Sequence, residues 1–264
     1  MQQKIIEIRN LSKSFNNIPV LKNVNIRMEA GRVYAVVGKN GAGKSTFVKL
    51  LAGIHQPDEG EILYNGRRVN FRSPGDALTL GWSFVFQDLE LFDNLSIAEN
   101  VYFNNFPSEG LGVVSRKKIQ TMTQELCSKV GLKADCRTLV GQLGMGQKHL
   151  VAFMRMLARD ADVMIIDEIS SALTNEDAGY IFNVIRELKA KGKFIVFVTH
   201  NINEIYAQVD NVIVLRDGEV VVQEETARIK DKELVKSIVG QEVRKRYPKL
   251  PVRQGRELLR VKGP

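Results

Sequence analysis

The sequence predicts an α/β protein built around a parallel sheet, and three observations lead to that fold class. Runs of β-branched and aromatic residues alternate with segments of helical periodicity up to about residue 240. Of the 264 residues, 44% are hydrophobic and 26% are charged, which is typical of a globular chain with a sizeable core. A glycine-rich stretch at residues 38–46 lies between an apolar run and a helical run. We therefore expect one large α/β domain.

The expected elements follow in order along the chain. Helical spacing of apolar residues follows Ser115 and recurs at residues 181–188. Ser96 followed by Glu99 is typical of a capped helix start. Because no strong strand pattern occurs between about residues 88 and 160, we expect a helical insertion there. The strand-like runs are Lys4–Arg9, Val24–Met28, Arg32–Val37, Glu61–Tyr64, Ser83–Phe86, Val163–Ile166, Phe194–Val198, Val212–Leu215 and Val220–Val222.

Charge is distributed unevenly along the chain. The sequence holds 38 Lys and Arg against 30 Asp and Glu, a net charge of +8. Residues 241–264 alone carry eight basic and two acidic residues, so the other 240 residues carry only +2. A nearly neutral body with a basic tail is more typical of a solvated linker than of a nucleic-acid-binding face. We therefore expect a folded domain over residues 1–240, a linker over 241–264, and no nucleic-acid partner.

The sequence also favours a particular compartment. Met1 leads directly into a strand-like segment, so we expect neither a signal nor a transit peptide. The apolar runs are far too short to span a bilayer. Cys127 and Cys136 are the only cysteines and lack metal-ligand or redox spacing. These features predict a soluble chain in a reducing cytosol.

Residues 38–46 read G-K-N-G-A-G-K-S-T, which matches the phosphate-binding pattern G-x-x-x-x-G-K-S between a strand and a helix. Gly41 and Gly43 lack side chains, so the backbone can curl and direct its N–H groups at phosphate oxygens. The helix N-terminus adds a favourable dipole. Lys44 brings a cation to the outer phosphates, and Ser45 offers a hydroxyl to Mg²⁺. This stretch predicts a nucleotide-phosphate site.

Two adjacent carboxylates, Asp167 and Glu168, end another apolar run. Because neighbouring strand residues face opposite ways, we expect Asp167 to hold a water on Mg²⁺ and Glu168 to polarise the attacking water as a general base. A solvated cap is the alternative, and the phosphate loop favours catalysis over it. The chain contains neither D-x-x-G nor N-K-x-D, which disfavours a GTPase.

Two further polar residues follow apolar strands. His200 comes after Phe194–Val198, and we expect it to contact the terminal phosphate, with a purely structural role as the alternative. Gln87 comes after residues 82–86, and its side-chain oxygen suits Mg²⁺ and water. Both would lie at the same strand-end edge as the carboxylates.

In this order, the motifs resemble the nucleotide-binding subunit of an ATP-binding-cassette (ABC) transporter over about residues 3–240. The resemblance implies a P-loop NTPase ABC cassette, with a RecA-like core sheet, an antiparallel β subdomain and a helical insertion. It implies ATP and Mg²⁺ as cofactors and Glu168, His200 and Lys44 as catalytic residues. Phe15 would stack on adenine, although core packing is the alternative for this residue. The ATP-binding loop it implies is Gly38, Lys39, Asn40, Gly41, Ala42, Gly43, Lys44, Ser45 and Thr46, and the metal contacts are Ser45, Gln87 and Asp167.

Segments 87–101, 199–206 and 239–249 look like those of ribose- and galactose-type monosaccharide importers, whose ATPase typically holds two tandem cassettes. This resemblance implies hydrolysis of ATP to ADP and phosphate, coupled to sugar import at the cytoplasmic face of the cell membrane. The implied partners are a second cassette in the same polypeptide or as a dimer partner, transmembrane permease subunits and, indirectly, a sugar-binding protein. Lys4–Asn10 is similar to Glu257–Gly263, so residues 241–264 would hold a linker and the first strand of a truncated second cassette. The alternatives are a non-transport ABC-type ATPase acting on nucleic acid and a nucleotide-binding module with little hydrolysis.

The chain departs from the family pattern at the signature loop. The usual L-S-G-G-Q reads Leu143, Gly144, Met145, Gly146 and Gln147. In this family the loop of one cassette closes over the ATP held by the other, and Gly144 lacks the hydroxyl that would bond the terminal phosphate. Because a hydrogen bond to a charged group contributes roughly 1.5–3 kcal/mol, we expect that ATP to be held less well. The chain's own ATP site, in contrast, has its full set of residues.

Overall fold

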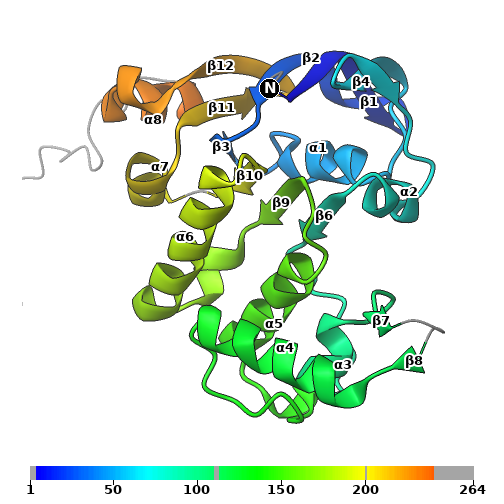
Figure 1. Ribbon diagram of the computed structural model, residues 1–264. Coiled ribbons are helices and arrows are strands. Elements are labelled where there is room, and N and C mark those ends of the chain that lie inside the picture. The colour runs from blue at the N-terminus through cyan, green and yellow to red at the C-terminus, as the bar shows by residue number, and fades with distance from the viewer. Residues whose placement is uncertain (1–3, 110–112, 200, 241–264) are drawn as a thin grey trace, which may run out of the picture.

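In the computed structural model, which describes residues 4–109, 113–199 and 201–240, a six-stranded sheet forms the centre of the molecule. Its strand order is β12-β11-β3-β10-β9-β6, and neighbouring strands are parallel except that β12 is antiparallel to β11 (Figure 1). This arrangement confirms the predicted α/β fold class. The strands are β3 (Val33–Val37), β6 (Trp82–Val85), β9 (Val163–Asp167), β10 (Phe194–Val198), β11 (Asn211–Arg216) and β12 (Glu219–Glu225).

A four-stranded antiparallel sheet lies at the upper right of Figure 1, in the order β2-β1-β4-β5. Asn16 and Asn17 form the first hairpin turn with φ of 50° and 63°, and Asn65 and Gly66 form another with φ of 53° and 74°. These residue types readily adopt the left-handed conformation that such turns need. The first hairpin is longer than predicted, because register shifts along β1 carry the strand past its polar residues. The strands are β1 (Ile5–Phe15), β2 (Ile18–Glu29), β4 (Glu59–Tyr64) and β5 (Arg67–Val69).

The expected helix starts are present. Ser96 accepts a hydrogen bond from the N–H of Glu99, whose carboxylate accepts from the N–H of Ser96, and Ser115 caps the next helix. The segment between residues 88 and 160 contains α3, α4 and α5. It also contains a hairpin of two short strands, β7 (Ser108–Glu109) and β8 (Val113–Val114), which the sequence did not predict. The helices are α1 (Lys44–Leu51), α2 (Pro74–Thr79), α3 (Ile97–Val101), α4 (Arg116–Lys129), α5 (Met145–Leu157), α6 (Asn175–Ala190), α7 (Ile202–Gln208) and α8 (Asp231–Val239).

Buried residues cover both faces of the parallel sheet. On β9, Val163 and Ile165 belong to the core that α1 and the antiparallel sheet share, whereas Met164 and Ile166 belong to the core formed with α5 and α6. A strand buried on both faces must be apolar throughout, which is why these strands could be recognised from the sequence. The same packing fixes the positions at which the strands end.

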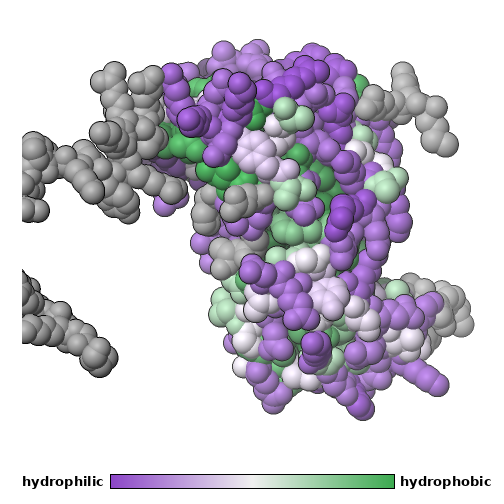
Figure 2. All heavy atoms as spheres, turned by 90° about the vertical axis from the view of Figure 1, so that its left-hand side faces the viewer, coloured by the Kyte–Doolittle hydropathy of each residue, from purple (hydrophilic) through white to green (hydrophobic). Residues whose placement is uncertain are grey.

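The surface differs from one region to another. On the face that carries α6, α7 and α8, hydrophilic residues cover most of the upper and lower parts, and hydrophobic residues gather near the middle (Figure 2). Among the helices within the described ranges, none combines the length and the hydrophobicity needed to span a bilayer. The predicted linker and strand at residues 241–264 lie outside the described residues.

Candidate nucleotide-binding site

The register of the parallel sheet brings the predicted site residues to one edge. Asp167 at the end of β9 pairs with Val198 of β10, and Val85 of β6 pairs with Ile166. Gln87 therefore follows β6 beside the position at which Asp167 and Glu168 leave β9. The phosphate loop leaves β3, the neighbour of β10 on its other side, at the same edge. Ligands of parallel α/β sheets bind at this carboxyl edge.

The phosphate loop depends on two of its glycines for its shape. Gly43 precedes α1 with a φ of 103°, a conformation that residues with a side chain rarely adopt. At Gly38, an added Cβ would lie 2.2 Å from the backbone oxygen of Leu215, so β11 leaves no space for a side chain. Of the other loop residues, Asn40 and Gly41 are exposed, Ala42 is buried, and Thr46 is half-buried in the first turn of α1.

Two lysines of the loop have different partners. Lys44 is buried and folds back across the loop, where its ammonium donates to the carbonyls of Gly38 (2.9 Å) and Lys39 (3.1 Å). Its charge is therefore held inside the ring of backbone atoms. The ammonium of Lys39 turns away and donates to the carbonyl of Val239 at the end of α8 (2.8 Å). Lys44, and not Lys39, thus carries the positive charge of the loop interior.

Asp167 is a buried carboxylic acid at the sheet edge, with 6% of its surface exposed. Burial and, next, the negative charge of Glu168 raise its pKa to about 6, while the charges of Lys44 and Lys49 oppose this shift. Within the described part of the chain, the side chain of Asp167 forms neither an ion pair nor a hydrogen bond. A buried acid without a partner is destabilising unless a cation is supplied.

Glu168 follows Asp167 in a strained backbone conformation. Its φ is 50°, and its N–H donates to the carbonyl of Val198 (3.1 Å). A left-handed conformation is unusual for glutamate and costs of the order of 1 kcal/mol. The predicted alternation along the strand therefore ends at Asp167, and this turn rather than the pleat determines the direction of the Glu168 side chain.

The residues present fit a magnesium ion. Ser45 and Gln87 are exposed, carry oxygen ligands and belong to the same edge as Asp167, and oxygen is what Mg²⁺ requires. The charge of the ion would also compensate the buried acid. In the described ranges, no three His, Cys, Asp or Glu residues gather into a metal site of their own. Such a site needs phosphate oxygens to complete the coordination, as is usual for Mg²⁺ with nucleotides.

Phe15 ends β1 beside the phosphate loop. It pairs with Ile18 at the start of β2. Further along β2, Val20 and Leu21 approach the phosphate loop so closely that a Cβ added to Gly43 would lie 2.7 Å from Leu21. The ring is 37% exposed and packs edge-on against His55, with centroids 5.0 Å apart. This exposure favours a ring that can contact a ligand over one that packs in the core. Sequence reasoning did not anticipate His55, whose pKa is lowered by burial and by nearby lysines.

The signature loop lies in the helical segment rather than at the sheet edge. Gly144 is the N-cap residue of α5, and its N–H donates to the side-chain oxygen of Gln147 (3.1 Å). Met145 is 62% exposed, whereas Leu143 packs against the core. The carbonyl of Met145 lies 2.9 Å from Nδ1 of His149. The loop thus presents its backbone and Met145 outward.

His200 lies outside the described residues, so its predicted contact with the terminal phosphate stays a prediction. The structure thus brings the phosphate loop, Gln87, Asp167 and Glu168 to one edge, with Phe15 on the adjoining sheet. The signature loop of this chain lies instead at the start of α5, where Gly146 approaches the backbone of Ala172.

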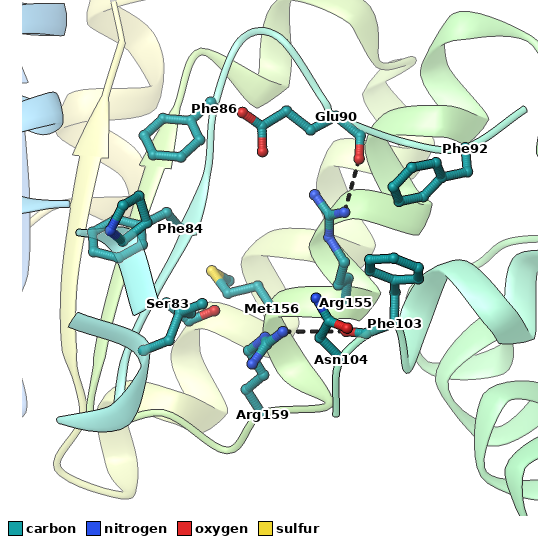
Figure 3. A pocket seen from close by; sticks show the side chains of 12 residues that line it. Ser83, Phe84, Phe86, Glu90, Phe92, Phe103, Asn104, Arg155, Met156 and Arg159 are labelled. Atoms are coloured by element: carbon teal, nitrogen blue, oxygen red, sulfur yellow. Dashed lines mark hydrogen bonds between the residues drawn. The ribbon is translucent and has the colours of Figure 1, made fainter. Parts of the chain in front are cut away.

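A pocket of about 260 Å³ lies between β6, α2 and α5 (Figure 3). Phe84, Phe86 and Phe92 line it, together with Arg155 of α5 and Arg159, which lies just after the end of that helix. Both guanidinium groups donate to backbone carbonyls, and burial lowers their pKa values. Sequence reasoning missed both arginines. The available signal was Arg155 within the apolar second half of α5, followed four residues later by a second arginine.

The fold and the edge together define a nucleotide-binding protein of the phosphate-loop class, because the loop, its lysine and the unpaired acid have the required placement. Residues 21–171 match the model of the ABC transporter family. The chain belongs to this family.

Curated relatives match almost the whole chain. A putative ribose/galactose/methyl galactoside import ATP-binding protein of Pseudomonas fluorescens is 36% identical over 258 residues, which cover 98% of this chain and 50% of that protein. The ribose import ATP-binding protein RbsA of Caldanaerobacter subterraneus subsp. tengcongensis is 36% identical over 261 residues, which cover 99% and 53%. The chain thus spans about half the length of the curated relatives it matches.

Solved structures agree with the fold. A dimeric ATP-binding cassette in a post-hydrolysis state with ADP and Pi has a TM-score of 0.76 and 27% identity, covering 84% of this chain and 98% of the other. An ATP-binding cassette of another ABC transporter has a TM-score of 0.78 and 23% identity, with 90% and 98% coverage, and supports the fold alone. The predicted P-loop ABC cassette is confirmed.

Proposed function

We propose that this chain is the ATP-binding and ATP-hydrolysing cassette of an importer for monosaccharides of the ribose and galactose type. The observation that carries the proposal is the buried, unpaired Asp167 beside the lysine-bearing phosphate loop. That pair of charges suits a magnesium-bound nucleotide better than any other common ligand. The sugar class comes from the names of relatives that match 98–99% of the chain.

Residues 1–240 form the ATPase cassette in this proposal, with the helical insertion at about 88–160. Residues 241–264 hold a basic linker and the first strand of a second cassette in this proposal. This reading is supported by the relatives, of which the chain covers 50–53%. The second cassette supplies the signature loop that closes over ATP bound here.

In the proposed reaction, the N–H groups of the phosphate loop and Lys44 bind the phosphates, and Phe15 stacks on the adenine. Ser45, Gln87 and a water bound to Asp167 would hold Mg²⁺, which would supply positive charge to the terminal phosphates when bound. Glu168 accepts a proton from water as the water oxygen attacks the terminal phosphorus. The bond from that phosphorus to the bridging oxygen breaks, and ADP keeps the electron pair. His200 contacts the departing phosphate.

The cassette acts with transmembrane permease subunits, at the cytoplasmic face of the cell membrane. A short apolar helix of such a subunit suits the pocket of Figure 3, because phenylalanine rings line the pocket and Phe92 is 41% exposed. A sugar-binding protein takes part indirectly by delivering the monosaccharide to the permease.

The two ATP sites of the complete transporter are unequal in this proposal. The site on this chain has every residue that hydrolysis needs. The other site is closed by Gly144, which has no hydroxyl for the terminal phosphate. The second site therefore binds or hydrolyses ATP less well.

Calorimetry tests the central claim. Titration of Mg·ATP into the chain is expected to release heat of binding, and Lys44→Ala is expected to weaken that binding by at least tenfold. Full-length protein reconstituted with its permease should import labelled ribose or galactose, and the Lys44→Ala transporter should not. The absence of any Mg·ATP binding by well-folded chain would refute the proposal, and import of neither sugar would refute the substrate class.

A further inference from the structure

Arg155 is a largely buried cation that is bound by backbone atoms alone. Its guanidinium donates to the carbonyl of Leu89 (2.8 Å) and to that of Glu90 (3.0 Å), and Figure 3 shows it directed at the Glu90 backbone. Among the described residues it forms no ion pair. The planar fork of arginine suits two neighbouring acceptors, and lysine cannot reproduce this geometry.

The backbone at this contact is unusual. Glu90 has a φ of 48°, a left-handed conformation that asparagine and aspartate adopt readily and glutamate rarely. A loop with this turn needs an external contact to keep it, and the described structure supplies that contact through Arg155. The position of residues 89 and 90 is thus determined by α5.

Gln87 lies in a short bridge that is fixed at both ends. On one side, Val85 pairs with Ile166 in the parallel sheet. On the other side, Arg155 binds residues 89 and 90. Gln87 itself is exposed between the two. Loss of the Arg155 contact would free one end of the bridge and leave the reach of the Gln87 side chain undefined.

The same helix connects this contact to two other features. α5 begins at Gly144 of the signature loop, and Arg155 lies eleven residues further on, about 16 Å along the helix axis. Near its start, Lys148 also binds Asp93 (2.7 Å), which belongs to the loop that follows Gln87. Glu90 and Arg155 both line the pocket, so an occupant of the pocket touches the contact directly.

We propose that Arg155 is a positioning residue for the magnesium site: by holding Leu89 and Glu90 against α5, it holds Gln87 where it reaches the ion. Through α5 it also links that position to the signature loop and to the pocket. The inference rests on the proposed role of Gln87 as a metal ligand at the ATP site.

The test measures the dissociation constant of ATP by calorimetry, once with Mg²⁺ and once with excess EDTA. The ratio of the constant in EDTA to the constant with Mg²⁺ then reports how much the ion strengthens ATP binding. Removal of a group that orients a metal ligand typically weakens metal affinity 10- to 100-fold. Arg155→Met is therefore expected to lower the ratio about tenfold while the affinity in EDTA stays within twofold. Arg155→Lys should give an intermediate loss, because one ammonium cannot serve both carbonyls at once.

Arg159→Met is the matched control. Arg159 lies four positions after Arg155, just beyond the end of α5, and lines the same pocket. Its guanidinium donates to the carbonyl of Phe103 (3.3 Å) instead of to the Gln87 loop. It removes the same charge from the same pocket, so the ratio should stay within twofold. A loss of the ratio as large as that in Arg155→Met would assign the effect to the pocket charge and overturn the inference.

A double-mutant cycle decides whether Arg155 acts through Gln87. Gln87→Ala alone is expected to lower the ratio of the two dissociation constants. In that background, Arg155→Met is expected to change the ratio by less than a further twofold. An additive effect of Arg155→Met, or none in either background, would overturn the inference while leaving ATP binding by the unmodified chain intact. Failure of the proposed function would instead appear as an unmodified chain that binds no Mg·ATP. Should Arg155→Met not fold, Arg155→Lys is taken through the same cycle.

Discussion

Gly144→Ser is expected to tighten the ATP site that this chain's signature loop is proposed to close. Gly144 has φ of −70° and ψ of 162°, which is ordinary extended backbone that serine adopts without strain. A Cβ added there would meet only the side-chain oxygen of Gln147, at 3.9 Å. Serine therefore fits this position with no rearrangement of the helix.

The magnitude follows from the new hydrogen bond. A bond from a hydroxyl to a charged phosphate contributes roughly 1.5–3 kcal/mol, which corresponds to about 10- to 150-fold in affinity. Serine is also a good N-cap residue, but the gain over glycine is only a few tenths of a kcal/mol. Nearly all of the expected change thus depends on contact with ATP and vanishes in the absence of nucleotide.

The assay is calorimetric titration of Mg·ATP into a protein that holds both cassettes, where the weaker of two binding steps should tighten. Gly144→Ala is the control, because it adds the same Cβ without the hydroxyl. Equal affinities for the serine and alanine variants at both sites would refute the reasoning from the missing hydroxyl. Without nucleotide, the alanine variant should be about 1 kcal/mol less stable than the serine variant, because residue 144 is the N-cap of α5 and alanine is a poor N-cap residue.

Three further outcomes are expected. Glu168→Gln should keep Mg·ATP affinity within about threefold in calorimetry and lower phosphate release by a factor of the order of 10² to 10⁴, and persistent turnover would remove Glu168 from the role of base. Asp167→Asn should stabilise the nucleotide-free chain in EDTA by roughly 3 kcal/mol, or about 8 °C in Tm, because burial raises the pKa of Asp167 to about 6 and ionisation then opposes folding. That gain is present above pH 6, declines as the pH falls towards 4 and is absent below it, so a gain independent of pH would contradict the assignment. Ser96→Ala should lower the free energy of unfolding by about 1 kcal/mol in urea titrations, since it removes the cap that accepts from Glu99, and an unchanged midpoint would show that the cap contributes nothing.

The sequence was sufficient for the parts of the fold whose environment is uniform. β9 and β10 are buried on both faces and can only be apolar, so the sequence showed their extent and the polar residues at which they end. The caps at Ser96 and Ser115 were equally visible, because each depends on residues within one helical turn. The phosphate loop was found because its conformation requires glycine at fixed positions.

Contacts between distant segments could not be predicted in the same way. Arg155 binds backbone carbonyls of residues more than sixty positions earlier. Because every residue has a backbone carbonyl, the sequence does not show which one accepts the bond. His55 reaches Phe15 only because the chain after α1 returns to the first hairpin. The first hairpin itself was underestimated, since its bulges shift the alternation of polar and apolar residues that would have shown its length.

The backbone offers an independent indication of where function lies. Among the described residues, the non-glycine positions with positive φ are asparagine or aspartate, with two exceptions, Glu90 and Glu168. Asparagine and aspartate tolerate this conformation, whereas glutamate does so at a cost of the order of 1 kcal/mol. One exception is the proposed base, and the other is held by Arg155 in the loop of Gln87. Together with the unpaired acid of Asp167, these strained positions surround the same edge of the sheet. Substitutions that relax them should therefore stabilise the empty cassette and impair its use of Mg·ATP, whereas changes at the asparagine turns should alter stability alone.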